Sequence, residues 1–253
     1  MLSKFHHRSE RLEHIDIGDY TEHEYEGCIK ELQLVNEWMG DARALRLSLL
    51  RAIKNAGTRS FSILDVGAGS GELLRVAADW CRETNRTMHA IGLELNPRSA
   101  SAINDESAAY ENIKAVRGDA LSLPFHDRAF DYVISSLFTH HFTNEDIVSI
   151  LREMKRVAAR GIYIIDLHRH PIAYFLYTTV GKLVLHNRLL REDGALSILR
   201  SFNPKELFEL AAEAGLEDIS VARHFPFRLV LSASVNRLGN FSTPAAMSRH
   251  QAA

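Results

Sequence analysis

Between residues 61 and 234, short apolar runs alternate with longer segments in which apolar residues recur every three or four positions. The short runs have the length and composition of buried strands, and the longer segments have the periodicity of amphipathic helices. We expect strands at residues 61–67, 88–95, 113–119, 130–137, 161–167, 218–225 and 227–234, and helices at 71–81, 97–109, 144–158 and 203–216. Nearly continuous apolar strands that alternate with helices predict a parallel sheet covered on both faces.

The last two expected strands are joined by little more than Pro226. So short a joint allows only antiparallel pairing, because a parallel connection needs a crossover of a dozen or more residues. The pattern therefore predicts an α/β fold with seven strands, mostly parallel, in which the last strand is antiparallel.

Residues 1–58 lie outside this alternation and are expected to form an N-terminal helical cap. One apolar stripe at helical spacing consists of Leu32, Val35, Met39, Leu45, Leu49 and Ile53. We expect Gly40 to end one helix of the cap and Asp41 to be the N-cap of the next.

A second segment outside the alternation, residues 168–202, follows the fifth strand. Its aromatic and aliphatic residues are at helical spacing, with Tyr174, Phe175 and Tyr177 near the start. Such an insertion either packs on the sheet or forms a lid over an apolar pocket. We expect residues 59–235 to form one domain that includes this lid, and residues 236–253, polar and rich in small residues, to be a flexible tail.

Composition and charge narrow the class of protein. The 253 residues include 30 Lys and Arg against 32 Asp and Glu, a net charge of −2, which provides no basic surface for nucleic acid. Cys28 and Cys81 are too far apart and too few for a disulfide framework or a cysteine zinc site. The start of the chain lacks the apolar core of a signal peptide, and the longest apolar stretch, residues 172–185, is shorter than the roughly 20 residues of a membrane span. We expect a cytoplasmic protein without a membrane span.

Three glycines follow the first expected strand, in residues 65–71, DVGAGSG. Ligands of open α/β sheets bind beyond the carboxyl ends of the strands, where glycines allow close approach and a helix N-terminus offers unpaired N–H groups. A dinucleotide fingerprint has its third glycine three residues after the second, whereas here the interval is two. A P-loop needs Lys followed by Ser or Thr, where this chain has Glu72 and Leu73. Both phosphate-binding interpretations are therefore disfavoured.

Four motifs in order resemble those of the class I S-adenosylmethionine-dependent methyltransferases of the small-molecule type. Residues 65–71 resemble the glycine-rich motif, and Glu94 matches the acidic residue that receives the ribose hydroxyls. Asp119 and Ala120 resemble the element beside the adenine, and residues 130–142 resemble the fourth-strand motif at the methionine end. Many relatives have Asp at the position of Glu94, a change that keeps the carboxylate. The resemblance covers about residues 61–234 apart from the insertion.

The resemblance implies a Rossmann-like sheet and S-adenosylmethionine as cofactor. We expect the N-terminal cap to fold over the cofactor edge, because its apolar stripe must be buried. The implied cofactor-binding residues are Asp65, Gly67, Ala68, Gly69, Gly71, Glu94, Leu95, Asp119, Ala120, Ser135 and Ser136. Asp65 would lie near the cofactor's amino group, although it could simply cap the helix that follows. A carboxylate at position 94 can accept from two adjacent hydroxyls. Asp131, which opens the fourth strand, is expected to be structural.

Methyl transfer to an oxygen requires an aligned nucleophile, removal of its proton and exclusion of water. His140 and His141 lie just beyond the fourth strand and match a His-His-hydrophobic element of small-molecule members, whose role ranges from structural to substrate-contacting. Since adjacent side chains diverge, we expect one of the two to face the pocket, where it could be the base. Residues 168–170, His-Arg-His, could contact a polar substrate group, close over the cofactor, or form a solvated charged turn. Neither histidine cluster has the spacing of metal ligands, so we expect no metal.

The sequence thus predicts a methyltransferase that acts on a small, fairly apolar metabolite, by O-methylation of a phenolic, quinol-like or polyketide-derived acceptor. Three alternatives remain at this point. The acceptor atom could be nitrogen or carbon, or the fold could serve a non-catalytic binding protein. A nucleotide-dependent oxidoreductase is disfavoured by the glycine spacing. The sequence does not predict an oligomeric state.

Overall fold

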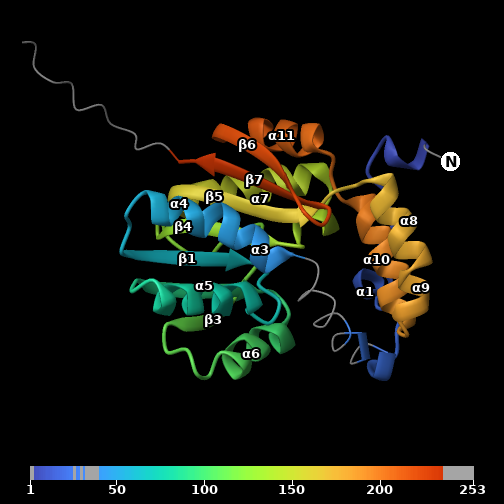
Figure 1. Cartoon of the computed structure of the whole chain (residues 1–253), viewed down its shortest axis with the longest axis horizontal. Helices are drawn as coiled ribbons and strands as arrows, with labels where there is room; N and C mark the ends of the chain where they lie inside the picture. Colours follow the sequence, from blue (N-terminus) through green and yellow to red (C-terminus); the bar gives the residue numbers. More distant parts are fainter. Residues whose placement is uncertain (1–2, 25–26, 29–30, 32–39, 236–253) are drawn as a thin grey trace, which may run out of the picture.

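The computed structural model describes residues 3–24, 27–28, 31 and 40–235, with a sheet of strand order β3-β2-β1-β4-β5-β7-β6 at its centre (Figure 1). The strands are β1 (Ser60–Val66), β2 (Thr87–Glu94), β3 (Ile113–Arg117), β4 (Phe130–Ser136), β5 (Ala158–Leu167), β6 (Glu217–His224) and β7 (Arg228–Ser234). Strands β1 to β5 are parallel, whereas β7 is antiparallel to both β5 and β6. This confirms the predicted seven-stranded sheet.

Helices cover both faces of the sheet (Figure 1). They are α3 (Asp41–Leu45), α4 (Arg51–Asn55), α5 (Glu72–Glu83), α6 (Pro97–Glu106), α7 (Asn144–Val157) and α11 (Pro204–Glu213), with a π-helical turn at Arg46–Leu50 between α3 and α4. On one face, Leu49, Leu74 and Ile103 are buried against the sheet, and on the other Leu151 and Leu207 are. The apolar periodicity read from the sequence therefore corresponds to two separate cores.

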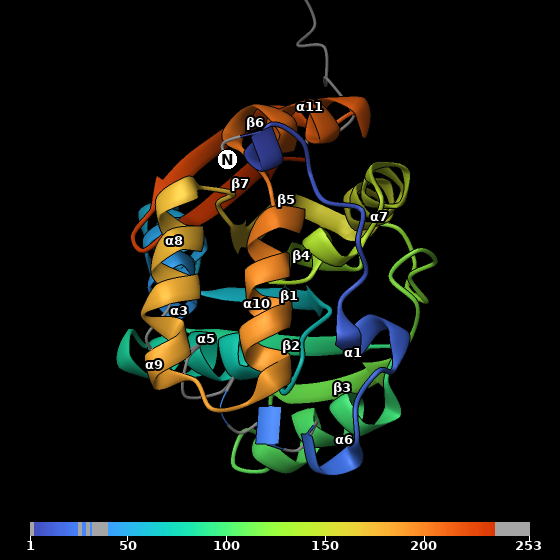
Figure 2. The same ribbon diagram turned by 90° about the vertical axis from the view of Figure 1, so that its right-hand side faces the viewer.

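Three more helices stand at the carboxyl end of the parallel strands: α8 (Pro171–Thr179), α9 (Gly181–Val184) and α10 (Arg188–Arg200) (Figure 2). Their starts have local causes. Pro171 occupies the first turn of α8, where the His170 ring accepts from the amide of Ile172. The side chain of Asn187 caps α10 in the same manner. We call residues 171–200 the lid; they are helical, as predicted.

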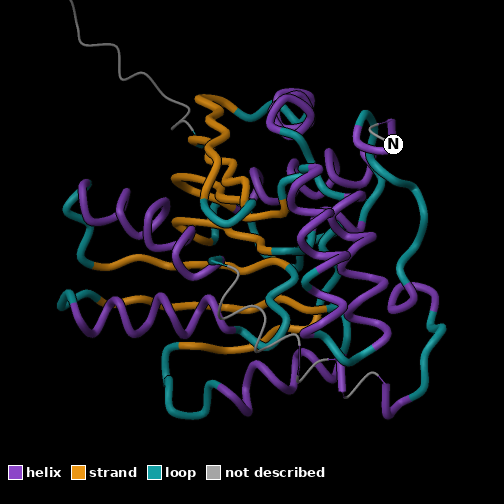
Figure 3. The backbone as a smooth tube through the Cα atoms, turned by 45° about the vertical axis from the view of Figure 1, so that its right-hand side comes forward, coloured by secondary structure: helices purple, strands orange, loops and turns teal. Residues whose placement is uncertain are grey.

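Residues 3–24 form an N-terminal strap that runs across the lid and contains α1 (His14–Ile17) (Figures 2 and 3). Arg8 of the strap donates from Nε to the carbonyl oxygen of Arg200 at 2.7 Å. The first two amides of α1 donate to the carboxylate of Asp193 in α10, at 2.8 and 3.1 Å. The strap and the lid are therefore hydrogen-bonded to each other. In the described part of the chain, none of the helices is long and apolar enough to cross a membrane.

Two expectations about the first 58 residues are wrong. Residues 6–13 form no helix, because strap and lid side chains bond this segment instead. Asp41 is not an N-cap: Gly40, with φ of +89°, precedes α3, and Asp41 is its first residue. The buried part of the apolar stripe comprises Leu45, Leu49 and Ile53. The other members, Leu32, Val35 and Met39, lie outside the described residues, as does the expected tail at 236–253.

The carboxylate of Asp41 is used in a buried ion pair with Arg228, the first residue of β7. Arg228 Nε lies 2.6 Å from Asp41 Oδ1, and Nη2 lies 3.0 Å from Oδ2. Only 5% of Asp41 and 1% of Arg228 are exposed. Because two parallel N–H···O bonds fix the geometry, this pair anchors α3 to the sheet.

We expect Asp41→Ala to lower the free energy of unfolding by about 3–5 kcal/mol, since it leaves a buried guanidinium unpaired. Denaturant titration measures the loss. The matched control is Glu209→Ala, which removes an exposed pair with Lys205 at 3.5 Å and should cost less than about 1 kcal/mol. Equal losses in the two variants would contradict the anchoring role.

Candidate functional site

A cavity of about 910 Å³ lies at the carboxyl ends of β1, β4 and β5, under the lid. Its lining includes the glycine loop with Asp65 and Glu94, and the two histidines that follow β4. Its lid walls are mostly apolar: Ala173, Leu176, Val180, Leu185, Leu190 and Ile198. The arrangement joins a polar, glycine-lined region to an apolar chamber.

Glycines shape the polar end of the cavity. Gly67 has φ of +72°, and a Cβ there would meet the ring of Phe138 at 2.3 Å, so no side chain fits. Gly69 also has a positive φ of +58°, but nothing lies within 4 Å of the place of its missing Cβ. The loop therefore leaves space for a ligand to approach its backbone.

Asp65, at the end of β1, is an unpaired buried acid. It is 2% exposed, and its Oδ1 has no hydrogen-bond partner among the described residues. Burial, with a smaller contribution from the charge of Glu94, raises the pKa of Asp65 to about 8. A buried carboxylate oxygen without a partner is costly, so this position suits a ligand that brings a donor or a positive charge.

Glu94, at the end of β2, lies beside the same loop. Its Oε1 accepts from the amide of Gly69 at 2.6 Å, and burial raises its pKa. This bond, with backbone hydrogen bonds from Leu95 and Asn96, holds the carboxylate at the cavity wall, where it can accept further hydrogen bonds from a ligand's hydroxyl groups.

The structure brings together only some of the predicted cofactor-binding residues. Those that line the cavity are Asp65, Gly67, Ala68, Gly69, Glu94 and Ser136. The others, Gly71, Leu95, Asp119, Ala120 and Ser135, do not line it. Asp119 is exposed and its Oδ1 accepts from the Leu121 amide at 2.9 Å, and Ser135 donates to the Val66 carbonyl at 2.7 Å. Asp131 bonds Ser62 and Arg160, as a structural residue would.

His140 is held by a buried carboxylate that the sequence analysis did not single out. His140 is 3% exposed, and its Nδ1 lies 2.6 Å from Oδ1 of Asp166, the last polar residue of β5. Burial alone would raise the pKa of Asp166, but the charge of His140 and hydrogen bonds from His140 and Thr139 outweigh it and set the pKa at about 2. With Nδ1 bound to a carboxylate, Nε2 of His140 is the ring nitrogen left for a ligand.

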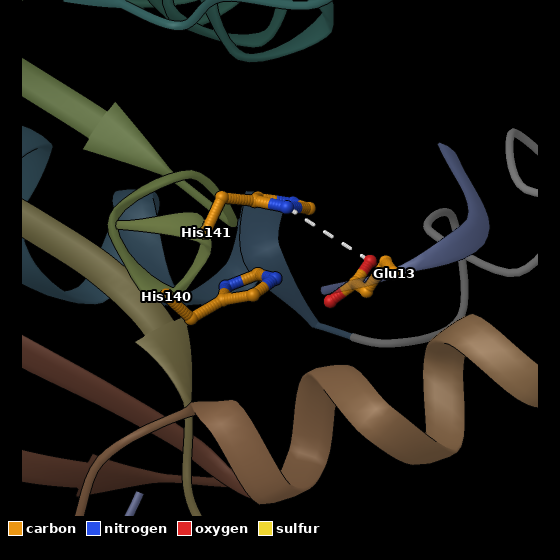
Figure 4. Close-up of side chains that lie close together, drawn as sticks. All are labelled: Glu13, His140 and His141. Carbon is orange, nitrogen blue, oxygen red and sulfur yellow. Dashed lines mark ion pairs between the residues drawn. The ribbon is translucent and has the colours of Figure 1, made fainter. Parts of the chain in front are cut away.

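Across from His140 lie His141 and Glu13, the latter contributed by the strap (Figure 4). The two imidazole rings are 4.4 Å apart, and His141 Nδ1 lies 3.2 Å from Asp16 Oδ1 and 3.9 Å from Glu13 Oε2. Burial raises the pKa of Glu13 to about 7. Both histidines thus reach the cavity, contrary to the expectation that only one would face it.

Glu13, His140 and His141 can each offer one metal-ligating atom, and these atoms lie within 4.8 Å of one another. The spacing of residues in the sequence did not indicate this group, because Glu13 comes from the strap. The guanidinium of Arg200, 3.8 Å from Glu13 Oε1, already supplies a positive charge. We therefore assign no metal to this group.

The turn at residues 168–170 is mainly structural, and of the alternatives left open by the sequence, the solvated turn does not describe its centre. Arg169 is 3% exposed, since it bonds the Ser201 carbonyl and Glu206. His170 caps α8, and only His168 lines the cavity. Burial, together with the charge of His170, lowers the pKa of His168 to about 4.

Two functional candidates, Asp166 and Glu13, were missed by sequence reasoning. Asp166 had a recognisable signal, because it is the acidic residue that ends the apolar run GIYIIDL at the carboxyl edge. Glu13 had none, since its position in the cavity depends on contacts between segments far apart in the chain.

Comparisons with known proteins place this geometry in context. Residues 63–161 match the model of a family described as a methyltransferase domain. The chain is 29% identical over 178 residues to a demethylmenaquinone methyltransferase of Bacillus licheniformis, an alignment that covers 65% of this chain and 72% of the relative.

Two solved structures show the same fold. One is a SAM-dependent methyltransferase from Aquifex aeolicus, with a TM-score of 0.56, 15% identity, and coverage of 81% of this chain and 98% of that one. The other is human N-acetylserotonin methyltransferase in complex with SAM, with a TM-score of 0.60, 16% identity, and coverage of 83% and 56%.

The buried Asp65 predicts a pH-dependent stability. Its folded pKa of about 8 lies above the ordinary 3.8, so its contribution to stability is complete below pH 4 and is lost as the pH rises through 8. In the ligand-free protein, Asp65→Asn should therefore raise the free energy of unfolding by roughly 2–5 kcal/mol at pH 8 and change it little at pH 4. Denaturant titrations at the two pH values measure this. The exposed Asp119→Asn is the control variant, and a pH-independent effect of Asp65→Asn would contradict the burial argument.

Proposed function

We propose that this chain, which is a class I S-adenosylmethionine-dependent methyltransferase, methylates an oxygen of a small, largely apolar metabolite. The acceptor that fits best is phenolic, quinol-like or polyketide-derived. One observation carries the proposal: a single cavity joins the unpaired Asp65 and the glycine loop to an imidazole backed by a buried carboxylate, under an apolar lid. The name of the Bacillus licheniformis relative, a demethylmenaquinone methyltransferase, supports a quinol-like acceptor.

The polar end of the cavity fits the cofactor. Asp65 Oδ1, which lacks a partner, would receive the ammonium group of the methionine part, and the open backbone at Gly69 would lie against it. Glu94, fixed by the Gly69 amide, would accept the ribose hydroxyls. The proposal keeps Asp119 and Ala120 beside the adenine, because they follow β3, the strand that pairs with β2. It likewise keeps backbone contacts from Gly67, Ala68, Gly71, Leu95, Ser135 and Ser136.

The other end activates the acceptor. When bound, S-adenosylmethionine supplies an electrophilic methyl group on a sulfonium. His140 Nε2 would accept the proton of the acceptor hydroxyl as the O–CH₃ bond forms and the S–CH₃ bond breaks. Asp166 holds the Nδ1–H of His140, which fixes the ring orientation and stabilises the imidazolium that results. His141 would pack against this ring and contact the acceptor.

The lid and the strap would exclude water from this reaction. Leu176, Val180 and Leu185 present apolar walls to the acceptor. A net charge of −2 and this apolar chamber favour a small molecule over nucleic acid. Cys28 and Cys81 are free and buried, which agrees with the cytoplasmic location included in the proposal.

Isothermal titration calorimetry with S-adenosylmethionine tests the cofactor end. Asp65→Ala, Glu94→Ala and Asp119→Ala should each weaken binding about 10- to 100-fold, because each removes a charged hydrogen-bond partner. Asp105→Ala, an exposed acid on α6, is the control and should bind like the wild type. Absence of binding by the wild type would refute the proposed cofactor, and unchanged binding by one variant would remove that residue from the site.

Turnover tests the acceptor end, measured as methyl transfer to dihydroxynaphthalenes as probe acceptors. His140→Ala and Asp166→Asn should lower kcat by about 10²-fold or more, the usual contribution of a positioned base, with cofactor affinity near that of the wild type. His141→Ala should have a smaller effect because the carboxylate at hydrogen-bond distance from its ring, that of Asp16, is partly exposed, whereas Asp166 behind His140 is fully buried. Dialysis against EDTA should leave turnover unchanged. Retained turnover in both histidine variants would point to an acceptor atom that needs no base, such as nitrogen or carbon.

A further inference from the structure

Glu13 belongs to the strap, which lies outside the parallel-sheet core, and its side chain is buried in the acceptor end of the cavity. It is 3% exposed and lines the cavity together with His140 and His141. Figure 4 shows its carboxylate directed at the space between the two imidazole rings. The function proposed above gives this side chain no role.

The two oxygens of Glu13 differ in their surroundings. Oε1 accepts from the hydroxyl of Ser197 in α10 at 2.8 Å and lies 3.8 Å from Arg200 Nε. Oε2 lies 3.9 Å from His141 Nδ1, which is too long for a hydrogen bond. The first oxygen is therefore held by the lid, and the carboxylate also forms a capping box with the backbone of Asp16 in α1. Each carboxylate oxygen can accept more than one hydrogen bond, so Glu13, which lines the cavity, can still accept from a ligand donor.

Asp193 attaches the strap to the lid independently of Oε2 of Glu13. Asp193, also buried in the lid, uses both oxygens to accept the first two amides of α1. That carboxylate is fully used by the fold. The cavity that Glu13 lines also has apolar walls, among them Ile15, Leu190 and Ile198, and a buried carboxylate is costly unless donors reach it.

We infer that Glu13 recognises a second hydroxyl group of the acceptor, adjacent to the hydroxyl that His140 deprotonates. The inference rests on the proposed function and narrows its acceptor class to lipophilic ring compounds with two neighbouring hydroxyl groups. Burial raises the pKa of Glu13 to about 7, so above that pH its carboxylate is ionised and only accepts hydrogen bonds. Under those conditions the matching group on the acceptor must be a donor.

The separation of the groups fits two neighbouring donors. The ligating atoms of Glu13, His140 and His141 lie within 4.8 Å of one another. Hydrogen bonds span about 2.6–3.2 Å, so two oxygens of one ring can reach Glu13 and His140 at the same time. One hydroxyl has a single proton and can donate to only one of these acceptors. A diol satisfies both.

The simpler explanation is that Glu13 only ties the strap to the lid through Ser197. The two roles separate by mutation, because Ser197→Ala removes the tie and leaves Oε2 in place. If Glu13 only ties the strap to the lid, Glu13→Gln and Ser197→Ala should change the relative affinity for different ligands to the same extent.

The test is binding of two matched probes, 2,3-dihydroxynaphthalene and 2-naphthol, to the full chain without cofactor, by calorimetry. The wild type should prefer the diol by about tenfold or more, the usual value of a hydrogen bond to a charged group. Glu13→Gln and Glu13→Leu should reduce the preference to about twofold or less while 2-naphthol still binds. Ser197→Ala should keep the preference, as should Asp19→Asn, an exposed acid of the same strap. Thermal unfolding verifies that each variant is folded.

Several results would overturn the inference: equal affinity of the wild type for both probes, no binding of either, or a preference that survives both Glu13 variants. Loss of preference in Ser197→Ala as large as that in Glu13→Gln would leave Glu13 with the structural role alone. Failure of the proposed function is a different result, since it would be absence of cofactor binding in a protein that still discriminates the two probes.

Discussion

The 2.6 Å contact between His140 and Asp166 is the interaction on which the rest of the site depends. Asp166 ends β5 with no exposed surface, so its carboxylate must find donors inside the protein. It finds them in the turn after β4, in the ring and amide of His140 and the hydroxyl of Thr139. Arg8 of the strap and Arg200 of the lid both donate to the carbonyl of His140, each at 3.1 Å. A single buried carboxylate therefore fixes the turn to which both added segments attach.

The same edge of the sheet holds acids that the fold leaves incompletely satisfied. Asp65 has an oxygen without a partner, and Oε2 of Glu13 lies 3.9 Å from His141 Nδ1, beyond hydrogen-bond distance. Burial raises the pKa of both. By contrast, Asp41 and Asp193, which also line the cavity, bond both oxygens within the fold. Asp65 and Glu13 thus reduce the stability of the protein, whereas Asp41 and Asp193 do not. This distribution is expected when the incompletely bonded acids bind a ligand.

Local sequence predicted the parts of the molecule that local forces determine. The strands and helices of the core were predicted from apolar periodicity, and the loop at residues 65–71 was predicted from its glycines. Both features depend on residues that are neighbours in the chain. The side-chain partners of Asp41 and Arg169 were not predictable. Each acquires its role from a residue brought near by the tertiary fold, and Asp41 reads as an N-cap until Arg228 of β7 is placed beside it. Glu13 was missed for the same reason.

The geometry of a parallel sheet explains why the core and the added segments have different roles. All its carboxyl ends meet at one edge, so the core can present a cofactor-shaped surface there but cannot close over it. Closure needs added segments, and here there are two, the strap and the lid. They are coupled through buried acids: the lid's Asp193 binds the amides of α1, and the strap's Glu13 binds the lid's Ser197. A change in one segment without the other would leave a buried carboxylate without donors, at a cost of several kcal/mol in an apolar chamber. The shape and polarity of the cavity under the lid are therefore properties of the pair, and a change of its shape by substitution in the lid alone would be limited by this coupling.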